Sequence, residues 1–367
     1  MKYVDEFRDP HLAERLVRRI HAIATRRWTI MEVCGGQTHS LLRHGIDEAL
    51  ADVIELLHGP GCPVCVTSAA AIDHAIELSL REQLLLCCFG DMFRVPGGNC
   101  SLSAARAQGG NVRAVYSPLD AVRIAARDPS REVVMFAVGF ETTAPATALA
   151  VRQARQLGLR NFSLLVAHVR VQPAMEAILQ DPNNRVAGFL AAGHVCTVVG
   201  YESYVEFCQR FRVPVVVTGF EPVDLLAGLL ECVAQLERGE CEARNCYERS
   251  ARADGNLHAQ AILNEVYEPC DLEWRGLGVV PRGGLRLREA WREFDAAIRW
   301  PRRTLPVIES SRCRSGEVLT GQLRAVDCEE FGRRCTPESP LGAPMVSSEG
   351  ACAAYYRYHG ASTSAAP

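Results

Sequence analysis

Residues 133–141 have the sequence VVMFAVGFE, an uninterrupted apolar run that ends in Gly-Phe-Glu. The residues that follow, 144–157, have the apolar spacing of a helix. Residues 216–222, VVTGFEP, repeat the pattern and also precede a helical segment, 223–236. A short apolar, β-branched run followed by a helix is typical of a parallel strand in an α/β protein. Since such sheets bind ligands at the carboxyl ends of their strands, the repeat also predicts a carboxylate at two strand ends.

The same alternation continues on both sides of this stretch. Eight apolar runs predict strands at 29–33, 53–57, 84–89, 112–116, 133–138, 162–166, 186–190 and 215–217. A further helical pattern lies at 68–80, and residues 11–26 predict an amphipathic helix. Eight strands fit one large sheet or two small ones. The Gly-Phe-Glu repeat favours two, and we therefore expect two similar small α/β domains with parallel sheets.

The chain changes character after residue 240. A helical stretch at 251–266 gives way to a tail rich in glycine and proline, with few apolar runs from which to build a core. Four cysteines lie in this tail: Cys313, Cys328, Cys335 and Cys352. Four thiolates suit a [4Fe-4S] cluster or a zinc ion, but the spacing matches neither a zinc ribbon nor a bacterial ferredoxin. Incidental thiols remain an alternative, and the missing core favours a metal centre.

Composition excludes some chemistries. The chain has 367 residues, a formal net charge of −3 and 40 lysines and arginines, of which Lys2 is the only lysine. A P-loop needs a lysine after its glycines and a pyridoxal enzyme needs one for its Schiff base, so neither is expected. The charge balance gives no signal of nucleic-acid binding.

The cysteines are numerous for a protein of this length. There are 16 of them. The start of the chain is polar and acidic, with no signal-peptide pattern, and the apolar runs are too short to span a membrane. We therefore expect a cytoplasmic protein, in which cysteines more often bind metal or carry out redox chemistry than form structural disulfides.

Two of the cysteines lie between a predicted strand and a predicted helix. Residues 59–65 read GPGCPVC, which places Cys62 and Cys65 at a helix N-terminus, where the thiolate form is favoured. The pattern favours a redox dithiol over one half of a zinc site.

Cys34 and His194 each follow a predicted strand. Cys34 begins the sequence CGGQTH, whose glycines permit close approach of a ligand to the backbone. His194 could bind metal or carry a proton. Each has a plainer alternative, a buried inert thiol and a hydrogen-bonded structural histidine. We interpret Cys87 and Cys88 as core residues.

Taken together, these motifs resemble the hydrogenase maturation factor HypD family over nearly the whole chain. The matching segments are EVCGG (32–36), GPGCPVC (59–65), FGDMFRVPG (89–97), GFETTAP (139–145), GHV (193–195) and EPCD (268–271), followed by the four tail cysteines. Two positions depart from the family pattern: Gln37, where some relatives carry histidine, and Ala192, where proline is common.

The resemblance implies a function that spacing alone does not show. It implies a scaffold that assembles the Fe(CN)2CO unit of [NiFe]-hydrogenase with the partner HypC and receives cyanide from HypE. Iron would lie near Cys34 and His194, and the Cys62/Cys65 dithiol would exchange electrons with a [4Fe-4S] cluster held by the four tail cysteines. Glu141 and Thr142 would orient the cyanide donor or iron-bound groups.

The resemblance also implies a division into domains. We expect α/β domains at 29–158 and 159–240, and a cluster domain at 241–367 against which the helix in 1–28 packs. Two other functions stay open: a stand-alone iron–sulfur thiol-disulfide reductase and a structural zinc protein. A radical enzyme using S-adenosylmethionine is disfavoured because the chain has no Cys-x3-Cys-x2-Cys sequence.

Overall fold

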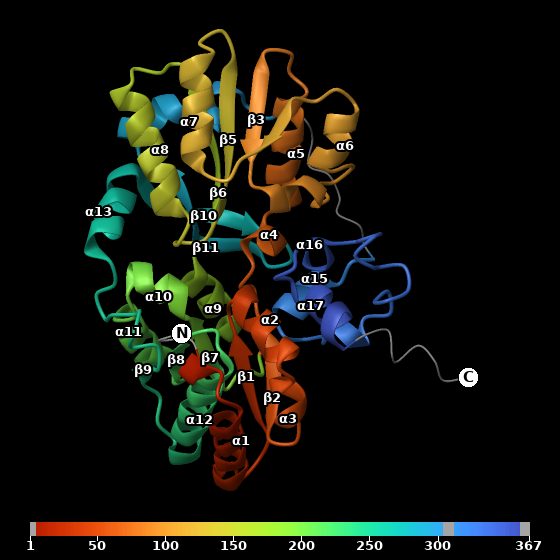
Figure 1. Ribbon diagram of the computed structural model, residues 1–367, viewed down its shortest axis with the longest axis vertical. Helices are drawn as coiled ribbons and strands as arrows, with labels where there is room; N and C mark the ends of the chain where they lie inside the picture. The colour runs from red at the N-terminus through yellow and green to blue at the C-terminus, as the bar shows by residue number, and fades with distance from the viewer. Residues whose placement is uncertain (1–4, 304–311, 360–367) are drawn as a thin grey trace.

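Two lobes, each built on a parallel sheet, are stacked along the long axis of the protein (Figure 1). The structure is a computed structural model and describes residues 5–303 and 312–359. A β-hairpin crosses the middle, and the C-terminal segment, residues 312–359, lies beside both lobes. No helix in these residues is both long and apolar enough to cross a bilayer.

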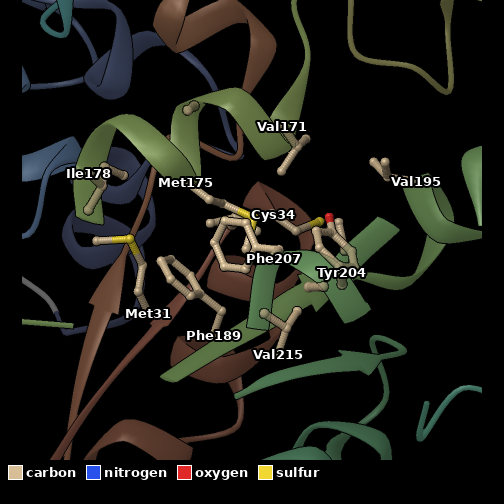
Figure 2. Packing of buried hydrophobic residues seen from close by; sticks show 14 of the residues in the cluster. Met31, Cys34, Val171, Met175, Ile178, Phe189, Val195, Tyr204, Phe207 and Val215 are labelled. Atoms are coloured by element: carbon tan, nitrogen blue, oxygen red, sulfur yellow. The ribbon is translucent and has the colours of Figure 1, made fainter. Parts of the chain in front are cut away.

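The five-stranded lobe has the strand order β2-β1-β7-β8-β9, all parallel. Its strands are β1 (Trp28–Glu32), β2 (Ile54–His58), β7 (Gly188–Ala192), β8 (Val215–Thr218) and β9 (Ala243–Asn245). One face is covered by α1 (Pro10–Ile23), α2 (Gly35–Arg43), α3 (Ile46–Ala49) and α12 (Pro222–Arg238), the other by α9 (Val171–Gln180), α10 (Gly193–Val199) and α11 (Ser203–Phe211). Ile30 and Met31 of β1 therefore point into different cores. Figure 2 shows the core under α9 and α11, which Cys34 also joins.

The four-stranded lobe has the order β4-β3-β5-β6, again all parallel. Its strands are β3 (Leu84–Cys88), β4 (Val112–Ala114), β5 (Glu132–Gly139) and β6 (Phe162–His168). Helices α4 (Pro63–Val66), α5 (Ala69–Ser79) and α6 (Leu102–Ala107), with the 3-10 helix η2 (Gly90–Arg94), cover one face, and α7 (Pro118–Arg127), α8 (Ala144–Gln156) and α13 (Leu257–Val266) cover the other. Cys87 and Cys88 are fully buried on opposite faces, so their interpretation as core residues is confirmed.

An antiparallel hairpin joins the two lobes. It consists of β10 (Tyr267–Trp274) and β11 (Gly278–Leu287). Tyr267 at one end is buried in the core of the four-stranded lobe, and Trp274 at the other is buried in the core of the five-stranded lobe. The short helices η3 (Glu289–Phe294) and α14 (Ala296–Arg299) then return along the four-stranded lobe.

The C-terminal segment has little regular structure and a small core. Its helices are α15 (Ser315–Leu319), η4 (Ala325–Asp327), α16 (Ala343–Val346) and α17 (Ala351–Tyr358). Val318, Ala325, Ala354 and Tyr355 pack with Leu42 of α2. Residues from α16 instead pack beside Cys62 and Cys65. The segment therefore touches both lobes where they meet.

The predicted α/β class with two parallel sheets is confirmed, and all eight predicted strands are present. The sheets do not follow the predicted boundary at residue 158, because β1 and β2 pair with β7–β9 while β3–β6 form the other sheet. The N-terminal helix α1 packs on α12, not on the C-terminal segment as expected. Residues 241–303 likewise belong to the lobes and the hairpin, so 241–367 is not one unit.

Candidate metal and redox centre

Cys34 lies at the turn between β1 and α2. It is the N-cap residue of α2, with an extended backbone (φ −151°), and its side chain is only 2% exposed. The Glu32 carboxylate accepts a hydrogen bond from the Cys34 N–H, at 2.7 Å. Gly61 in the neighbouring turn approaches so closely that a Cβ there would overlap the backbone of Val33 and Cys34. The turns after β1 and β2 therefore touch, because their strands are neighbours in the sheet.

Cys62 and Cys65 occupy that neighbouring turn and form a disulfide. Their Cα atoms are 5.2 Å apart, and the Cys62 sulfur accepts a hydrogen bond from the Cys65 N–H at the start of α4. Both residues are buried, and Ser347 after α16 lies 3.4 Å from the Cys62 sulfur. The predicted pairing within Cys-x-x-Cys is therefore what the structure shows.

His194 is the second residue of α10, the helix that directly follows β7, and it faces Cys34. Its Nδ1 lies 3.7 Å from the Cys34 sulfur. Burial lowers the pKa of His194 to about 4. Burial, and secondarily the Glu32 carboxylate, raise the pKa of the Cys34 thiol well above its usual value. At neutral pH the pair is therefore a protonated thiol beside a neutral imidazole, which can accept the thiol hydrogen at Nδ1.

The Cys34–His194 pair opens into a cavity of about 400 Å³ between the lobes. The five-stranded lobe contributes Phe220, and the four-stranded lobe contributes Phe140 and Thr142. Glu349 from the C-terminal segment also lines this cavity. Burial, and secondarily the neighbouring Asp91, raise the pKa of the Glu349 carboxyl. A cavity that combines apolar walls with convergent polar side chains is the usual form of a small-ligand site.

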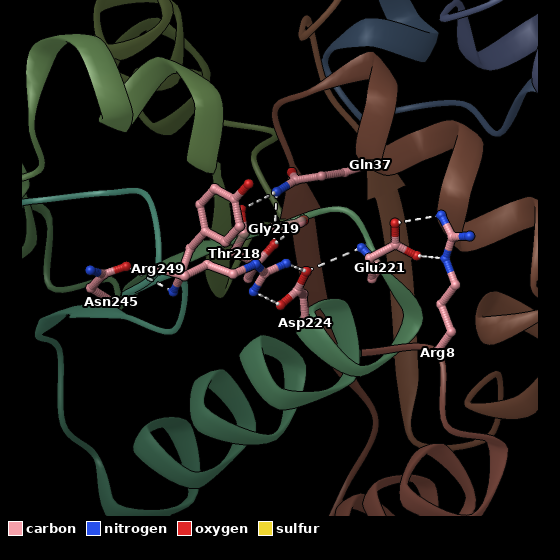
Figure 3. A network of polar contacts seen from close by, with 9 residues as sticks. Arg8, Gln37, Thr218, Gly219, Glu221, Asp224, Asn245 and Arg249 are labelled. Atoms are coloured by element: carbon pink, nitrogen blue, oxygen red, sulfur yellow. Dashed lines mark hydrogen bonds and ion pairs between the residues drawn. The ribbon is translucent and has the colours of Figure 1, made fainter. Parts of the chain in front are cut away.

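The two Gly-Phe-Glu segments contribute their phenylalanines to this cavity, not the predicted carboxylates. Glu141 is buried, accepts a hydrogen bond from the Val171 N–H, and lines a separate cavity of about 250 Å³. Glu221 pairs with Arg8 and caps α12 together with Asp224 (Figure 3). Both acids are therefore held by other partners.

Gln37 connects the start of α2 to two neighbouring strand ends. Its Nε2 donates to the carbonyl of Ala191 at 3.1 Å. It also donates to the hydroxyl of Thr218 at 2.8 Å (Figure 3). The side chain is fully buried and does not line the cavity. A glutamine at this position therefore orients the helix that carries Cys34.

The four tail cysteines converge on one small cavity although 39 positions separate the first from the last. Cys313, Cys328, Cys335 and Cys352 all line it. A Cβ at Gly342 would overlap the Cys313 sulfur, so the loop closes tightly around this site. Burial, followed by the neighbouring thiols, raises the pKa of Cys352 and of Cys335.

The arrangement is not that of a single-ion site. Across residues 5–303 and 312–359, no group of three or more His, Cys, Asp or Glu side chains could hold one metal ion. A tetrahedral zinc site would bring its four sulfurs within contact of one another. The four thiols therefore border a shared space without the close grouping of a single-ion site.

Comparison with known proteins identifies the family. The family profile described as "HypD: Hydrogenase formation hypA family" matches residues 11–359. The chain belongs to the HypD family. It is 47% identical to the hydrogenase maturation factor HypD of Azotobacter vinelandii, over 98% of this chain and 97% of that protein. The corresponding HypD of Escherichia coli K12 is 42% identical over 98% of each chain. The resemblance drawn from the motifs is therefore confirmed.

Several residues of this HypD-family site were missed in the sequence. Glu349 carries no motif, and only the folding of the C-terminal segment brings it to the cavity. Glu32 and His58 end two neighbouring strands, and their hydrogen bond of 2.9 Å could be predicted only from the strand order. The Gly-Phe-Glu repeat also contains Phe140 and Phe220, but it predicts its carboxylates, not its phenylalanines, as the groups at the strand ends.

Proposed function

We propose that this HypD-family protein is the scaffold on which the Fe(CN)2CO unit of [NiFe]-hydrogenase is assembled, together with HypC and with cyanide delivered by HypE. Membership of a hydrogenase maturation family supports the general role. The observation that carries the specific role is the meeting of the Cys34 thiol and the His194 imidazole in a cavity beside the Cys62–Cys65 disulfide.

Cys34 is the proposed anchor for iron. Iron that carries cyanide and carbon monoxide is soft, and a thiolate is a suitable ligand for it. Because burial raises the pKa of the Cys34 thiol, binding of iron must release its proton, and the neutral His194 imidazole lies beside the sulfur, with Nδ1 3.7 Å away. A cysteine of HypC would complete the iron site, and Phe140 and Phe220 would keep water from it.

Cys62 and Cys65 are the proposed electron source. As dithiol they release two electrons and two protons when they close the disulfide. Gly61 and Pro63, on either side of Cys62, line the cavity, so the dithiol would lie beside the proposed iron position. Thr142 lines the cavity and would orient the cyanide donor, whereas Glu141 lies outside it and receives no such role here.

The four tail cysteines fit a [4Fe-4S] cluster, since four thiols from separate segments share one cavity. Bound there, the cluster would supply electrons one at a time. Helix α16 contributes Pro344 and Met345 to that cavity and packs against α4, so one short helix lies between the four thiols and the disulfide.

Infrared spectroscopy tests the proposal. After anaerobic co-purification with HypC from cells that contain the maturation proteins, cyanide and carbonyl bands are expected for the wild type and not for Cys34→Ala. Cys241→Ala, a thiol away from the site, is the control. Bands that persist in Cys34→Ala, or that never appear in the wild type, contradict the proposal.

A metal analysis tests the cluster separately. Iron and labile sulfide are expected in the wild type and are expected to be lost in Cys328→Ala. Zinc without iron or sulfide would support the structural zinc alternative. The stand-alone reductase is disfavoured because Cys62 and Cys65 are 3% and 0% exposed, which keeps a protein disulfide from reaching them.

A further inference from the structure

Helix α17 carries two tyrosines that hydrogen-bond to histidines on either side of the Cys34 turn. The Tyr355 hydroxyl lies 3.1 Å from His58 Nε2, at the end of β2. The Tyr358 hydroxyl lies 2.9 Å from His39 Nε2, on α2. In both pairs the rings also meet edge to face, with centroids 5.2 and 5.1 Å apart.

The first of these contacts continues to the backbone of Cys34. His58 Nδ1 donates to Glu32 Oε1 at 2.9 Å, and Glu32 Oε2 accepts from the Cys34 N–H at 2.7 Å. Glu32 also accepts a hydrogen bond from the Thr38 hydroxyl, one turn into α2. Since the carboxylate only accepts, His58 carries its hydrogen on Nδ1, and Nε2 accepts from Tyr355.

Every side chain in this hydrogen-bond network is buried. Glu32 is fully buried, and His58 and Tyr355 are each 5% exposed. Removing one partner would therefore leave a buried polar group unpaired, which is more harmful than losing an exposed contact. Because such a network has few alternative arrangements, a shift of α17 would also shift the Cys34 turn.

The same helix supplies Cys352, one of the four tail thiols, one turn before Tyr355. Glu349, just before α17, packs so closely against Gly35 that a Cβ on that glycine would overlap it. The segment that bears the tail cysteines is thereby fastened to α2 at Gly35 and at His39, and to the end of β2 at His58.

We propose that Tyr355 and Tyr358 are positioning residues for Cys34, so that the Cys34 site takes its binding geometry only when the C-terminal segment is docked through α17. The proposal rests on the proposed function for the roles of Cys34 and of the tail cysteines. The physical claim is that the conformation of the Cys34 turn depends on the position of α17. This dependence can be measured whether or not Cys34 and the tail cysteines have the proposed roles.

Hydrogen exchange followed by mass spectrometry tests this dependence in the full-length, anaerobically purified chain. Tyr355→Phe keeps the ring and removes the hydroxyl. Peptides covering residues 32–38 are expected to exchange roughly threefold to tenfold faster, the effect of one lost buried hydrogen bond. Tyr358→Phe is expected to have the same effect on residues 37–43. Tyr356→Phe is the matched control and should change neither, because Tyr356 lies on the same helix but its ring packs on Phe331.

Unchanged exchange over 32–38 in Tyr355→Phe would overturn the proposal. So would an equal increase over all strands of the five-stranded lobe, since that would indicate general destabilisation. A second variant, Cys352→Ser, is expected to lose iron and to speed exchange over both 351–358 and 32–38. Loss of iron with full protection of 32–38 would also overturn it.

Infrared spectra of the complex with HypC separate this proposal from the one above. A shift of the cyanide bands in Tyr355→Phe, absent in Tyr356→Phe, is expected if the Cys34 geometry has changed, and unshifted bands count against the positioning role. Wild-type protein without any such bands, but with the expected exchange pattern, would refute the assembly function and leave the positioning role standing.

Discussion

At the scale of single residues, the Cys34 turn depends on a glycine in the next turn. A side chain at Gly61 would overlap the backbone atoms of Val33 and Cys34, and backbone cannot move aside as a flexible side chain can. Gly61 is thus required by the contact between two strand-end turns, which is also the contact that brings Cys34 next to the disulfide.

Gly61→Ala is therefore expected to lower the free energy of unfolding by about 3 kcal/mol or more, at the upper end for overpacked sites. Gly90→Ala is the matched control, because a Cβ at Gly90 meets no atom within 4 Å. Urea unfolding followed by circular dichroism measures both. Equal stability of the two variants would show that the turns can separate without loss.

Buried histidines make the protein sensitive to acid. His168 is fully buried, accepts from the Thr147 hydroxyl at Nε2, and donates from Nδ1 to the carbonyl of Gly139. Burial lowers the pKa of His168 to about 4, from 6.5 in an unfolded chain. Below pH 6.5 the unfolded state therefore binds a proton at His168, whereas the folded state does not bind it until about pH 4. The free energy of unfolding consequently falls as the pH decreases from 6.5 to about 4.

For His168 alone, this linkage amounts to about 2 kcal/mol between pH 7.5 and pH 5. His168→Gln is expected to be less stable than the wild type at pH 7.5 but to lose less stability on acidification. Urea midpoints at the two pH values give the comparison. A pH dependence identical to that of the wild type would show that His168 does not contribute.

At the scale of secondary-structure elements, the strands that were predicted and those that were missed differ in burial. The eight strands predicted from apolar runs lie in the two parallel sheets, and all but the short edge strand β4 are mostly buried, as a continuous apolar run requires. The hairpin was missed because β10 alternates buried and less buried residues and contains Pro269, while β11 contains Gly283 and Gly284. Such composition is usual in loops.

Part of the site could also be predicted from the positions of the strands. Cys34, Cys62, Cys65 and His194 follow strands and lie at one edge, as the strand-end rule predicts. Glu141 was misplaced because sequence does not show to which side of a helix start a side chain turns. Glu349 and Tyr355 come from a segment with no strand pattern, so only tertiary structure brings them to the site.

The missed hairpin has a measurable role. Trp274 is fully buried in the core of the five-stranded lobe. Its Nε1 donates to the Gly283 carbonyl at 3.0 Å, and its ring centroid lies 6.0 Å from that of Phe140, which follows β5 of the other lobe. Trp274→Ala is expected to cost about 3–5 kcal/mol of stability. Val279→Ala on β11, where the side chain is 67% exposed, should stay within about 0.5 kcal/mol of the wild type. A loss below about 1 kcal/mol for Trp274→Ala, measured by urea unfolding, would contradict a bridging role.

At the scale of the whole molecule, the chain passes from one lobe to the other and back. It builds β1 and β2, crosses to form β3–β6, and returns for β7–β9 (Figure 1). The first crossing contains the Cys62–Cys65 disulfide, and the cavity with Cys34 lies between the lobes. Because the segments that join the lobes also form the site, a change in the relative position of the lobes must change the cavity.

The C-terminal segment has a much smaller apolar core of its own than either lobe. Its own apolar cluster has six buried residues, one of them Leu42 from α2, whereas the sheets have extensive cores. A group bound by Cys313, Cys328, Cys335 and Cys352 would link four separate positions of the segment and supply the missing cohesion. Without such a group, the segment should open locally while both lobes remain folded.

Limited trypsin digestion tests this difference in stability between the parts. After anaerobic chelation of iron, cleavage is expected first at the exposed Arg324, Arg333 and Arg334, leaving a resistant fragment that contains both lobes. Untreated protein and Cys241→Ala should be cut at these sites at least roughly tenfold more slowly, as an opening penalty of about 1.4 kcal/mol would give. Equal cleavage before and after chelation would mean that the tail is held by its packing alone, and that the four thiols contribute nothing to its stability.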